Sequence, residues 1–416
     1  MPRQMFMQHG AMLAPRSPLA AYRQDLACRG GEEPFGPSDA TWLTLATILS
    51  RAVDAALDGR PPLLQTVRGV VDGDPALRDL LKLVDQESPA GLELDGVSPL
   101  VRAIVDRMEE LGALNLGYSM LATLADADLR LSILERGRVV AQLGRVAWKA
   151  GALETAREQY RKTELLGRVG RIPELRVRAW VGYSVVARLR GNYPEVRKWA
   201  ARAAHEADRA GLSALGSLAY HSLMVSAAVG GDLNAALVYG WRAYQGALGN
   251  PVKEAGALLN LAQFLLECGQ PKAAIRGFLA ALDREPVARL AFPALGGLAL
   301  AAAALGDRAL VLTTKARTER LIAIAPMPYE CAAVLLELSQ ALATIGDAVG
   351  AATCRTRAAE LAERHAYHEL VHRLDAIRLE PVARRAEAPH VLDLKGAEVA
   401  QAVASLGFAG SATGLE

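Results

Sequence analysis

The chain has 416 residues, of which 51% are hydrophobic, and its 47 basic side chains nearly balance its 45 acidic ones. This length and apolarity allow one large core or several cores, and together with the near-neutral charge they exclude a disordered chain and a globally basic nucleic-acid binder. Aromatic residues make up only 5%, too few for a typical β-sandwich, so we expect an all-α protein of closely packed helices.

The sequence shows no sign of export or of membrane insertion. Its longest nearly apolar run, residues 291–305, is shorter than the roughly 20 residues that a membrane-spanning helix needs. Residues 1–13 lack the uninterrupted apolar core of a signal peptide. The four cysteines lie far apart without a CxxC pair, which disfavours a disulfide framework and a structural zinc site. We therefore expect a cytoplasmic protein.

The first part of the chain lacks a clear repeat. Residues 1–37 show no helical periodicity and end at a Gly-Pro-Ser-Asp string that is typical of a helix start, so we predict a flexible leader there. Residues 38–132 carry apolar residues at helical spacing. They are predicted to form an N-terminal helical region, either of degenerate repeats or as a separate bundle.

Glycines recur along the chain at intervals of 37 to 40 residues. The series consists of Gly73, Gly112, Gly151, Gly191, Gly231, Gly269, Gly306 and Gly346. A glycine with positive φ can end one helix, and the Asp, Asn or Pro that often follows can start the next one. A period between 20 and 50 residues is typical of a solenoid, so each unit is predicted to be a helical hairpin.

The clearest unit runs from Leu258 through Gly269 and Phe278 to Pro286. It resembles the tetratricopeptide repeat, in which a large residue and a Leu-Gly or Leu-Ala pair precede the Gly turn, and an alanine, an aromatic residue and a closing proline follow. The resemblance covers about residues 133–365. It implies a right-handed α-solenoid of about six to eight hairpins, with helices longer than usual because the period is near 40 instead of 34.

Two segments follow the predicted solenoid. Residues 366–381 continue the helical pattern and are predicted to form a capping helix, since a solenoid must cover its last apolar face. Residues 382–416 contain few large apolar side chains. We predict a C-terminal tail there, in which residues 397–406 could form one loosely docked helix.

Charge is distributed unevenly along the chain. Residues 72–128 contain 12 acidic and 4 basic side chains, whereas residues 130–202 contain 17 basic and 6 acidic ones. Such opposite segments can pair within the chain, pair between subunits or attract a charged partner.

The tetratricopeptide resemblance implies that the first helix of each hairpin lines a concave groove. The polar and aromatic groove positions that it assigns are Arg138, Arg145, Trp148, Lys149, Arg178, Arg188, His221 and Gln263. Basic side chains beside an indole ring are suited to holding carboxylates while an apolar side chain stacks nearby. The alternative is that these cations form a solvated face. Nucleic-acid binding is disfavoured because no aromatic ladder or helix-turn-helix signature accompanies them.

One enzyme-like motif is present, the string His368-Glu369-Leu370-Val371-His372. In zinc hydrolases an HExxH helix binds the metal through both histidines and uses the glutamate to polarise water. Its context is unfavourable, because Arg373 follows directly and no third histidine lies downstream at the expected spacing. We predict an exposed face of the capping helix here, and keep a zinc-dependent hydrolase as the alternative.

The sequence therefore predicts a regulatory adaptor or sensor that is not an enzyme and needs no cofactor. It is similar to the tetratricopeptide sensor regions of bacterial regulatory proteins. That resemblance implies a protein or peptide partner with an acidic segment or a C-terminal carboxylate, held near Arg145, Lys149, Arg178 and Arg188. A structural role through self-association is a third hypothesis, and no membrane partner is expected.

Overall fold

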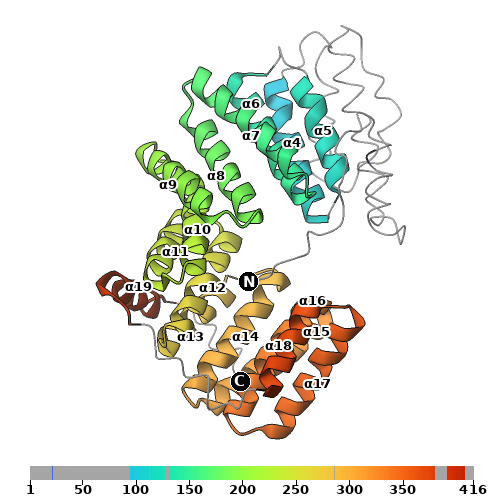
Figure 1. The fold of residues 1–416 in the computed structure, drawn as a ribbon, viewed down its shortest axis with the longest axis vertical. Coiled ribbons are helices and arrows are strands. Elements are labelled where there is room, and N and C mark those ends of the chain that lie inside the picture. Colours follow the sequence, from blue (N-terminus) through green and yellow to red (C-terminus); the bar gives the residue numbers. More distant parts are fainter. Residues whose placement is uncertain are drawn as a thin grey trace. The chain divides into compact units, whose positions relative to one another are not determined.

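The computed structural model describes Ala21 and residues 94–111, 113–126, 131–284, 286–325, 327–379 and 391–407. In these residues sixteen helices follow one another and no strand occurs (Figure 1). The predicted all-α solenoid of stacked helical hairpins is thereby confirmed. Except for Ala21, the predicted leader and residues 38–93 lie outside the described residues.

The chain divides into two compact units, residues 1–215 and residues 216–416. The helices of unit 1 are α4 (Leu94–Leu111), α5 (Leu114–Asp126), α6 (Ile133–Lys149), α7 (Leu153–Val169), α8 (Pro173–Leu189) and α9 (Tyr193–Arg209). Each of these helices packs against the next one, and α6 also packs against both α4 and α8. This is the packing of a hairpin stack, in which the first helices form one layer and the second helices another.

Unit 2 continues the pattern after α10 (Ser213–Val229), which begins three residues before the boundary. Its further helices are α11 (Leu233–Ala247), α12 (Pro251–Glu267), α13 (Pro271–Leu282), α14 (Ala288–Ala304), α15 (Arg308–Ile324), α16 (Pro328–Thr344), α17 (Ala348–Arg364), α18 (His368–Leu379) and α19 (Leu394–Ala404). The first helices α12, α14, α16 and α18 again contact one another in order. None of the described helices is both long and apolar enough to cross a bilayer.

The predicted glycine corners are confirmed wherever the structure describes them. From Gly151 to Gly346, the six corner glycines have φ between +71° and +83°. After most of these corners a polar side chain caps the next helix: the Asp232 carboxylate, for example, accepts a hydrogen bond from the Ala235 amide at 2.9 Å. Gly73 and Gly112 lie outside the described residues.

A second series of corners joins one hairpin to the next, and the sequence analysis missed it. These corners have their positive φ at Arg171 (+53°), Gly211 (+66°), Gly249 (+88°) and Ala366 (+52°). Most helices from α6 to α17 have 17 residues. Two such helices and their two short corners account for the repeat length near 40.

Replacing Arg171 by Gly should stabilise unit 1. A left-handed φ costs an L-residue roughly 1–2 kcal/mol, and the greater freedom of glycine in the unfolded chain offsets up to about 1 kcal/mol of the gain. We expect the free energy of unfolding to rise by up to about 1 kcal/mol in urea titrations. The matched control is Gly191→Ala, at a corner where an added Cβ meets nothing within 4 Å. It should lower stability, and a destabilising Arg171→Gly would contradict the strain at this corner.

Two aromatic residues connect neighbouring hairpins in the same way. Phe278 and Tyr160 each lie nine residues after a corner glycine. A Cβ added at Gly297 of α14 would lie 2.2 Å from the Phe278 ring, and one added at Gly182 of α8 would lie 2.3 Å from the Tyr160 ring. Each ring therefore occupies the space that a glycine leaves free on the first helix of the next hairpin.

Helices occur in both of the segments that follow the predicted solenoid. Helix α18 lies in the predicted capping segment and packs on α16 and α17, with Leu370 and Leu374 buried. Helix α19 lies in the predicted tail, yet it packs on α11 and α13 with Val399, Ala400 and Val403 buried. The helix is therefore docked.

Candidate binding surface on the first helices of unit 1

The structure distributes the predicted groove residues over four first helices. Arg138, Arg145, Trp148 and Lys149 lie on α6, Arg178 and Arg188 on α8, His221 on α10 and Gln263 on α12. The first six belong to unit 1 and the last two to unit 2. We call the surface of α4, α6 and α8 that carries Arg138, Arg145 and Arg178 the first-helix face.

A chain of ion pairs crosses the first-helix face from α4 to α8. Glu174 of α8 accepts two hydrogen bonds from Arg138, at 2.7 and 2.8 Å, and one from Arg178, at 2.9 Å. Arg138 also donates to Glu135 at 2.6 Å, and Glu135 accepts from Arg102 of α4 at 3.2 Å. Cations and carboxylates thus alternate across the three helices. Arg138 and Arg178 are already bound to carboxylates of the chain itself.

A second ion-pair cluster joins α4 to α6. Arg145 pairs with Asp106 and, at 2.9 Å, with Glu109, and Lys149 pairs with Glu109 at 2.7 Å. Only 2% of the Glu109 side chain is exposed. Burial alone would lower the pKa of Arg145, but the opposite charges of Glu109 and Asp106 raise it. The acidic and basic segments of the sequence therefore pair within the chain at these positions.

Arg188 also lies on α8 but differs from the cations of the first-helix face. It is half-buried in the last turn of α8, and no carboxylate pairs with it in the part of the chain that the structure describes. Burial lowers the pKa of Arg188, and Tyr193 offsets this effect only in part. A guanidinium that has lost water without gaining a carboxylate leaves its donors available to a ligand.

Trp148 does not offer an open stacking surface beside these arginines. It is half-buried and packs, with Tyr118 and Tyr183, against a small core cluster that contains Tyr160. The buried Tyr160 hydroxyl has a raised pKa because of burial, and a hydrogen bond with Trp148 opposes that rise. The indole therefore belongs to the packing between hairpins. His221 is half-buried, and the exposed Gln263 is 3.4 Å from Glu267 on its own helix.

Sequence reasoning missed a cavity of about 450 Å³ in unit 1, on the side of the second helices. Its lining residues are Glu154, Arg157, Glu158, Arg161, Glu164, Tyr183 and Trp199. The Tyr183 and Trp199 rings lie 4.9 Å apart, and Glu164 accepts hydrogen bonds from Tyr183 at 3.2 Å and from Trp180 at 3.1 Å. The signal for this cavity in the sequence was the alternation of acidic and basic residues along α7. These contacts hold α7, α8 and α9 together.

The HExxH string forms the first turns of α18. His368 and His372 are both exposed, and His365 stacks on Tyr367 with ring centres 5.5 Å apart. Within the described ranges, no three His, Cys, Asp or Glu side chains are arranged to hold a metal ion. Arg373 lies 3.8 Å from Glu337 of α16. The zinc-dependent hydrolase therefore stays a hypothesis that rests on the sequence string alone.

The ion pairs of Glu174 should affect how steeply the free energy of unfolding falls at acidic pH. Hydrogen bonds from Arg138 lower the pKa of Glu174 to about 2, against opposing burial. A lowered carboxyl pKa stabilises the fold above the unfolded-state value near 4.5, and this stabilisation is lost as the pH falls towards 2. We expect Glu174→Gln to remove about 2 kcal/mol of that dependence in urea titrations between pH 6 and pH 2.5. If the free energy of unfolding of Glu174→Gln fell with pH as steeply as that of the unchanged chain, this role of Glu174 would be contradicted.

The chain has similar proteins among the solved structures. No protein-family model matches the chain, and no curated protein matches it. A solved structure of BtubC (BKLC) from P. vanneervenii is similar at 14% identity with a TM-score of 0.40, over 52% of this chain and 87% of that one.

A second solved structure is that of the Signal Transduction ATPase with Numerous Domains (STAND) protein with a tetratricopeptide repeat sensor, PH0952, from Pyrococcus horikoshii. It is similar at 13% identity with a TM-score of 0.54, and the similarity covers 88% of this chain and 55% of that one. The chain thus spans about half the length of that protein. At this identity the similarity shows the fold alone, which is a stack of repeated helical hairpins like that of a tetratricopeptide-containing protein.

Proposed function

We propose that the chain is a protein-binding scaffold without catalytic activity of its own, which acts as a sensor or adaptor. Stacked hairpins leave a long surface with fixed side-chain spacing, and such surfaces commonly bind segments of other proteins. The partner segment is acidic or ends in a free carboxylate, and it binds unit 1 at Arg188, in the last turn of α8. No cofactor is needed for this role.

Arg188 is the observation that carries the proposal. It is a half-buried guanidinium without a carboxylate partner among the described residues, beside cations that all have one. A carboxylate of a partner can form two parallel hydrogen bonds with such a group, which favours the pair in a partly desolvated place. At Arg138 or Arg145 the same carboxylate would first have to displace an intramolecular one.

Binding of defined acidic peptides tests the proposal. The probe is a fluorescein-labelled peptide set with Asp or Glu in the last four positions, each made with a free and with an amidated C-terminus. Fluorescence anisotropy with the full chain should find members whose affinity falls at least tenfold with Arg188→Gln. Arg188→Lys should restore only part of it, because an ammonium lacks the planar fork.

The matched control is Arg190→Gln, because Arg190 pairs with Glu154 and lies only two residues from Arg188. It should change the affinity no more than about twofold. Equal affinity of the Arg188→Gln chain, or binding that is indifferent to the acidic residues, would place the interface elsewhere. The self-association hypothesis has its own readout, which is a change of sedimentation coefficient between low and high salt.

A further inference from the structure

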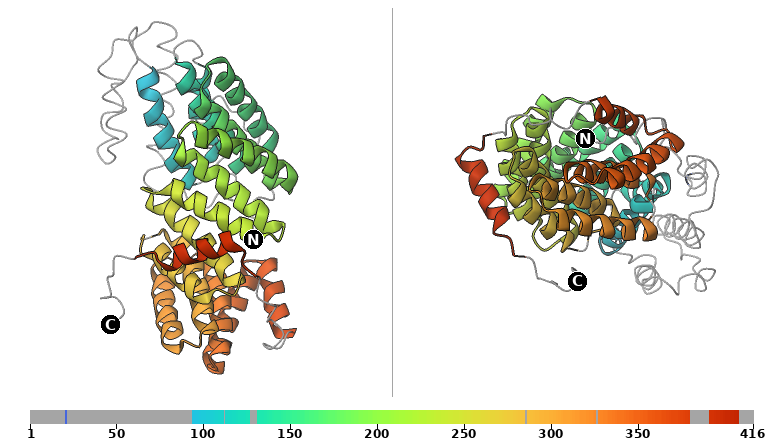
Figure 2. Two further views of the ribbon diagram at one scale, coloured as in Figure 1. Left: turned by 90° about the vertical axis from the view of Figure 1, so that its left-hand side faces the viewer. Right: turned by 90° about the horizontal axis from the view of Figure 1, so that it is seen from below.

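Helix α19 returns from the end of the chain to the middle of unit 2. It follows α18 by fourteen residues, yet it packs on the second helices α11 and α13 (Figures 1 and 2). In unit 1, no described helix packs in the same way across α7 and α9. Docking of α19 is therefore an addition to the hairpin stack and not part of its repeat.

The second helices of unit 2 are shaped to receive α19. Gly277 lies eight residues after its corner glycine, and Trp199 has the same place in α9. A Cβ at Gly277 would lie 2.9 Å from Ala262 of α12 and 3.2 Å from a methyl group of Val403, so this glycine admits both α12 and α19. Asn234 of α11 donates a hydrogen bond to the Val391 carbonyl at 3.2 Å and accepts one from the Asp393 amide at 3.0 Å. We call this surface of α11 and α13, with Asn234 and Gly277, the docking surface.

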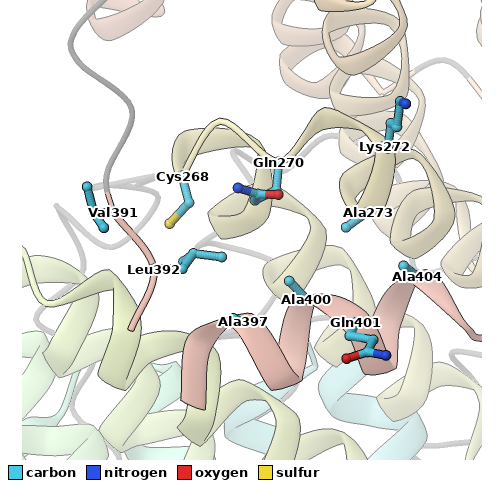
Figure 3. A pocket seen from close by; sticks show the side chains of 10 residues that line it. All are labelled: Cys268, Gln270, Lys272, Ala273, Val391, Leu392, Ala397, Ala400, Gln401 and Ala404. Carbon is cyan, nitrogen blue, oxygen red and sulfur yellow. The ribbon is translucent and has the colours of Figure 1, made fainter. Parts of the chain in front are cut away.

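The fit of α19 to the docking surface is incomplete. A cavity of about 580 Å³ remains beside it, and Figure 3 shows its lining side chains. From the stack it is lined by Cys268, Gln270, Lys272 and Ala273, and from the C-terminal segment by Val391, Leu392, Ala397, Ala400, Gln401 and Ala404. Most α19 side chains here are alanines, too short to fill the space. Lys272 is exposed and has no ion-pair partner in the described ranges.

We propose that the docking surface is a binding site for an amphipathic helix of a partner protein, and that α19 is its built-in competitor. At the positions equivalent to Ala397 and Ala404, the partner helix has apolar side chains larger than alanine, and these side chains fill the cavity. It also has an acidic residue that pairs with Lys272. Filling this space with apolar groups removes more surface from water than α19 does. The tether gives α19 a high effective concentration, so the site stays closed until such a helix arrives.

Peptide binding to the full chain tests the competition. The probe is a fluorescein-labelled peptide of residues 389–407 that carries Ala397→Leu and Ala404→Leu. Two chain variants weaken the docking of α19 without changing the docking surface. Val403→Asp places a charge in the contact between α19 and that surface. Asp393→Ala removes the helix cap, in which the Asp393 carboxylate accepts a hydrogen bond from the Gly396 amide at 2.7 Å. We expect about 100-fold tighter probe binding by the first variant and about tenfold by the second. Glu398→Ala, at an exposed position of α19, is the matched control and should equal the unchanged chain.

A second arm asks whether the probe occupies the docking surface itself. Adding Asn234→Ala to the Val403→Asp chain should weaken the probe about tenfold, because two hydrogen bonds are lost. Alkylation of Cys268 by iodoacetamide, followed peptide by peptide, should accelerate in the Val403→Asp chain and slow again when the probe is added. Cys331 and Cys354 are buried and do not line the cavity, so they should react at unchanged rates.

Three outcomes would overturn the proposal. The probe could bind all chains with equal affinity, or it could bind none of them. The unchanged chain could also sediment as a dimer that Val403→Asp dissociates, in which case the occupant is α19 of a second copy. If all three thiols react faster in the Val403→Asp chain, that variant has lost its fold and the Asp393→Ala chain decides instead.

Discussion

Replacing Phe278 by Ala should lower the free energy of unfolding of unit 2 by about 3–5 kcal/mol. The side chain has no exposed surface and is among the largest fully buried ones in the described residues. Its ring fills the space that Gly297 leaves free on α14. The variant would therefore lose both the burial of the ring and the contacts around the cavity that remains.

Hydrogen exchange read by mass spectrometry measures this effect, because it reports α12, α13 and α14 separately from unit 1. Amides of these three helices should exchange faster, while those of α6 to α8 keep their protection. Phe278→Leu is the control and should cost less than about 1.5 kcal/mol, since it conserves most of the volume. A loss below about 1 kcal/mol for Phe278→Ala would show that α14 moves in to fill the gap.

Replacing Gly182 by Ala should destabilise unit 1 by about 1–3 kcal/mol. The new methyl group would lie 2.3 Å from two atoms of the Tyr160 ring. Tyr160 is only 4% exposed and its hydroxyl is hydrogen-bonded to Trp148, so the ring has no room to move aside. Alanine is the better helix former by up to about 1 kcal/mol, and the clash should exceed this gain.

The chain offers a control for the helix-propensity effect. Gly256 also lies within a helix, α12, but a Cβ added there meets nothing within 4 Å. Gly256→Ala should therefore raise stability by about 0.5–1 kcal/mol. Urea unfolding followed by tryptophan fluorescence measures the Gly182→Ala effect, because Trp148, Trp180 and Trp199 lie in unit 1, whereas Trp241 is the one described tryptophan of unit 2. Stabilisation by Gly182→Ala would show that the Tyr160 ring is not fixed.

Features that depend on the identity of a single residue could be predicted from the sequence. A glycine is the usual residue at positive φ, so Gly151 and its counterparts gave both the corners and the period of the fold. The second series was missed because Arg171 and Ala366 adopt positive φ without being glycine. At those two corners the sequence carries no signal, whereas Gly211 and Gly249 could have been found.

Features that depend on contacts between helices were harder to predict. The helices that carry Arg138, Arg145 and Arg178 follow from the repeat, but their pairing with Glu174 and Glu109 depends on how α4, α6 and α8 are offset along their axes. The sequence predicted only a loosely docked helix at α19, because alanine and valine give a weak signal and Gly277, against which α19 packs, lies on another helix far back in the chain.

The corners inside the hairpins, where a first helix meets its second helix, affect how such a chain can change in length during evolution. At Gly191, Gly231, Gly306 and Gly346 an added Cβ would touch nothing within 4 Å, so these corners project from the body. Each hairpin begins and ends at a corner and relies mainly on its immediate neighbours. Gene duplication or deletion of one whole period would therefore leave the remaining interfaces intact. Selection can lengthen or shorten the surface one hairpin at a time.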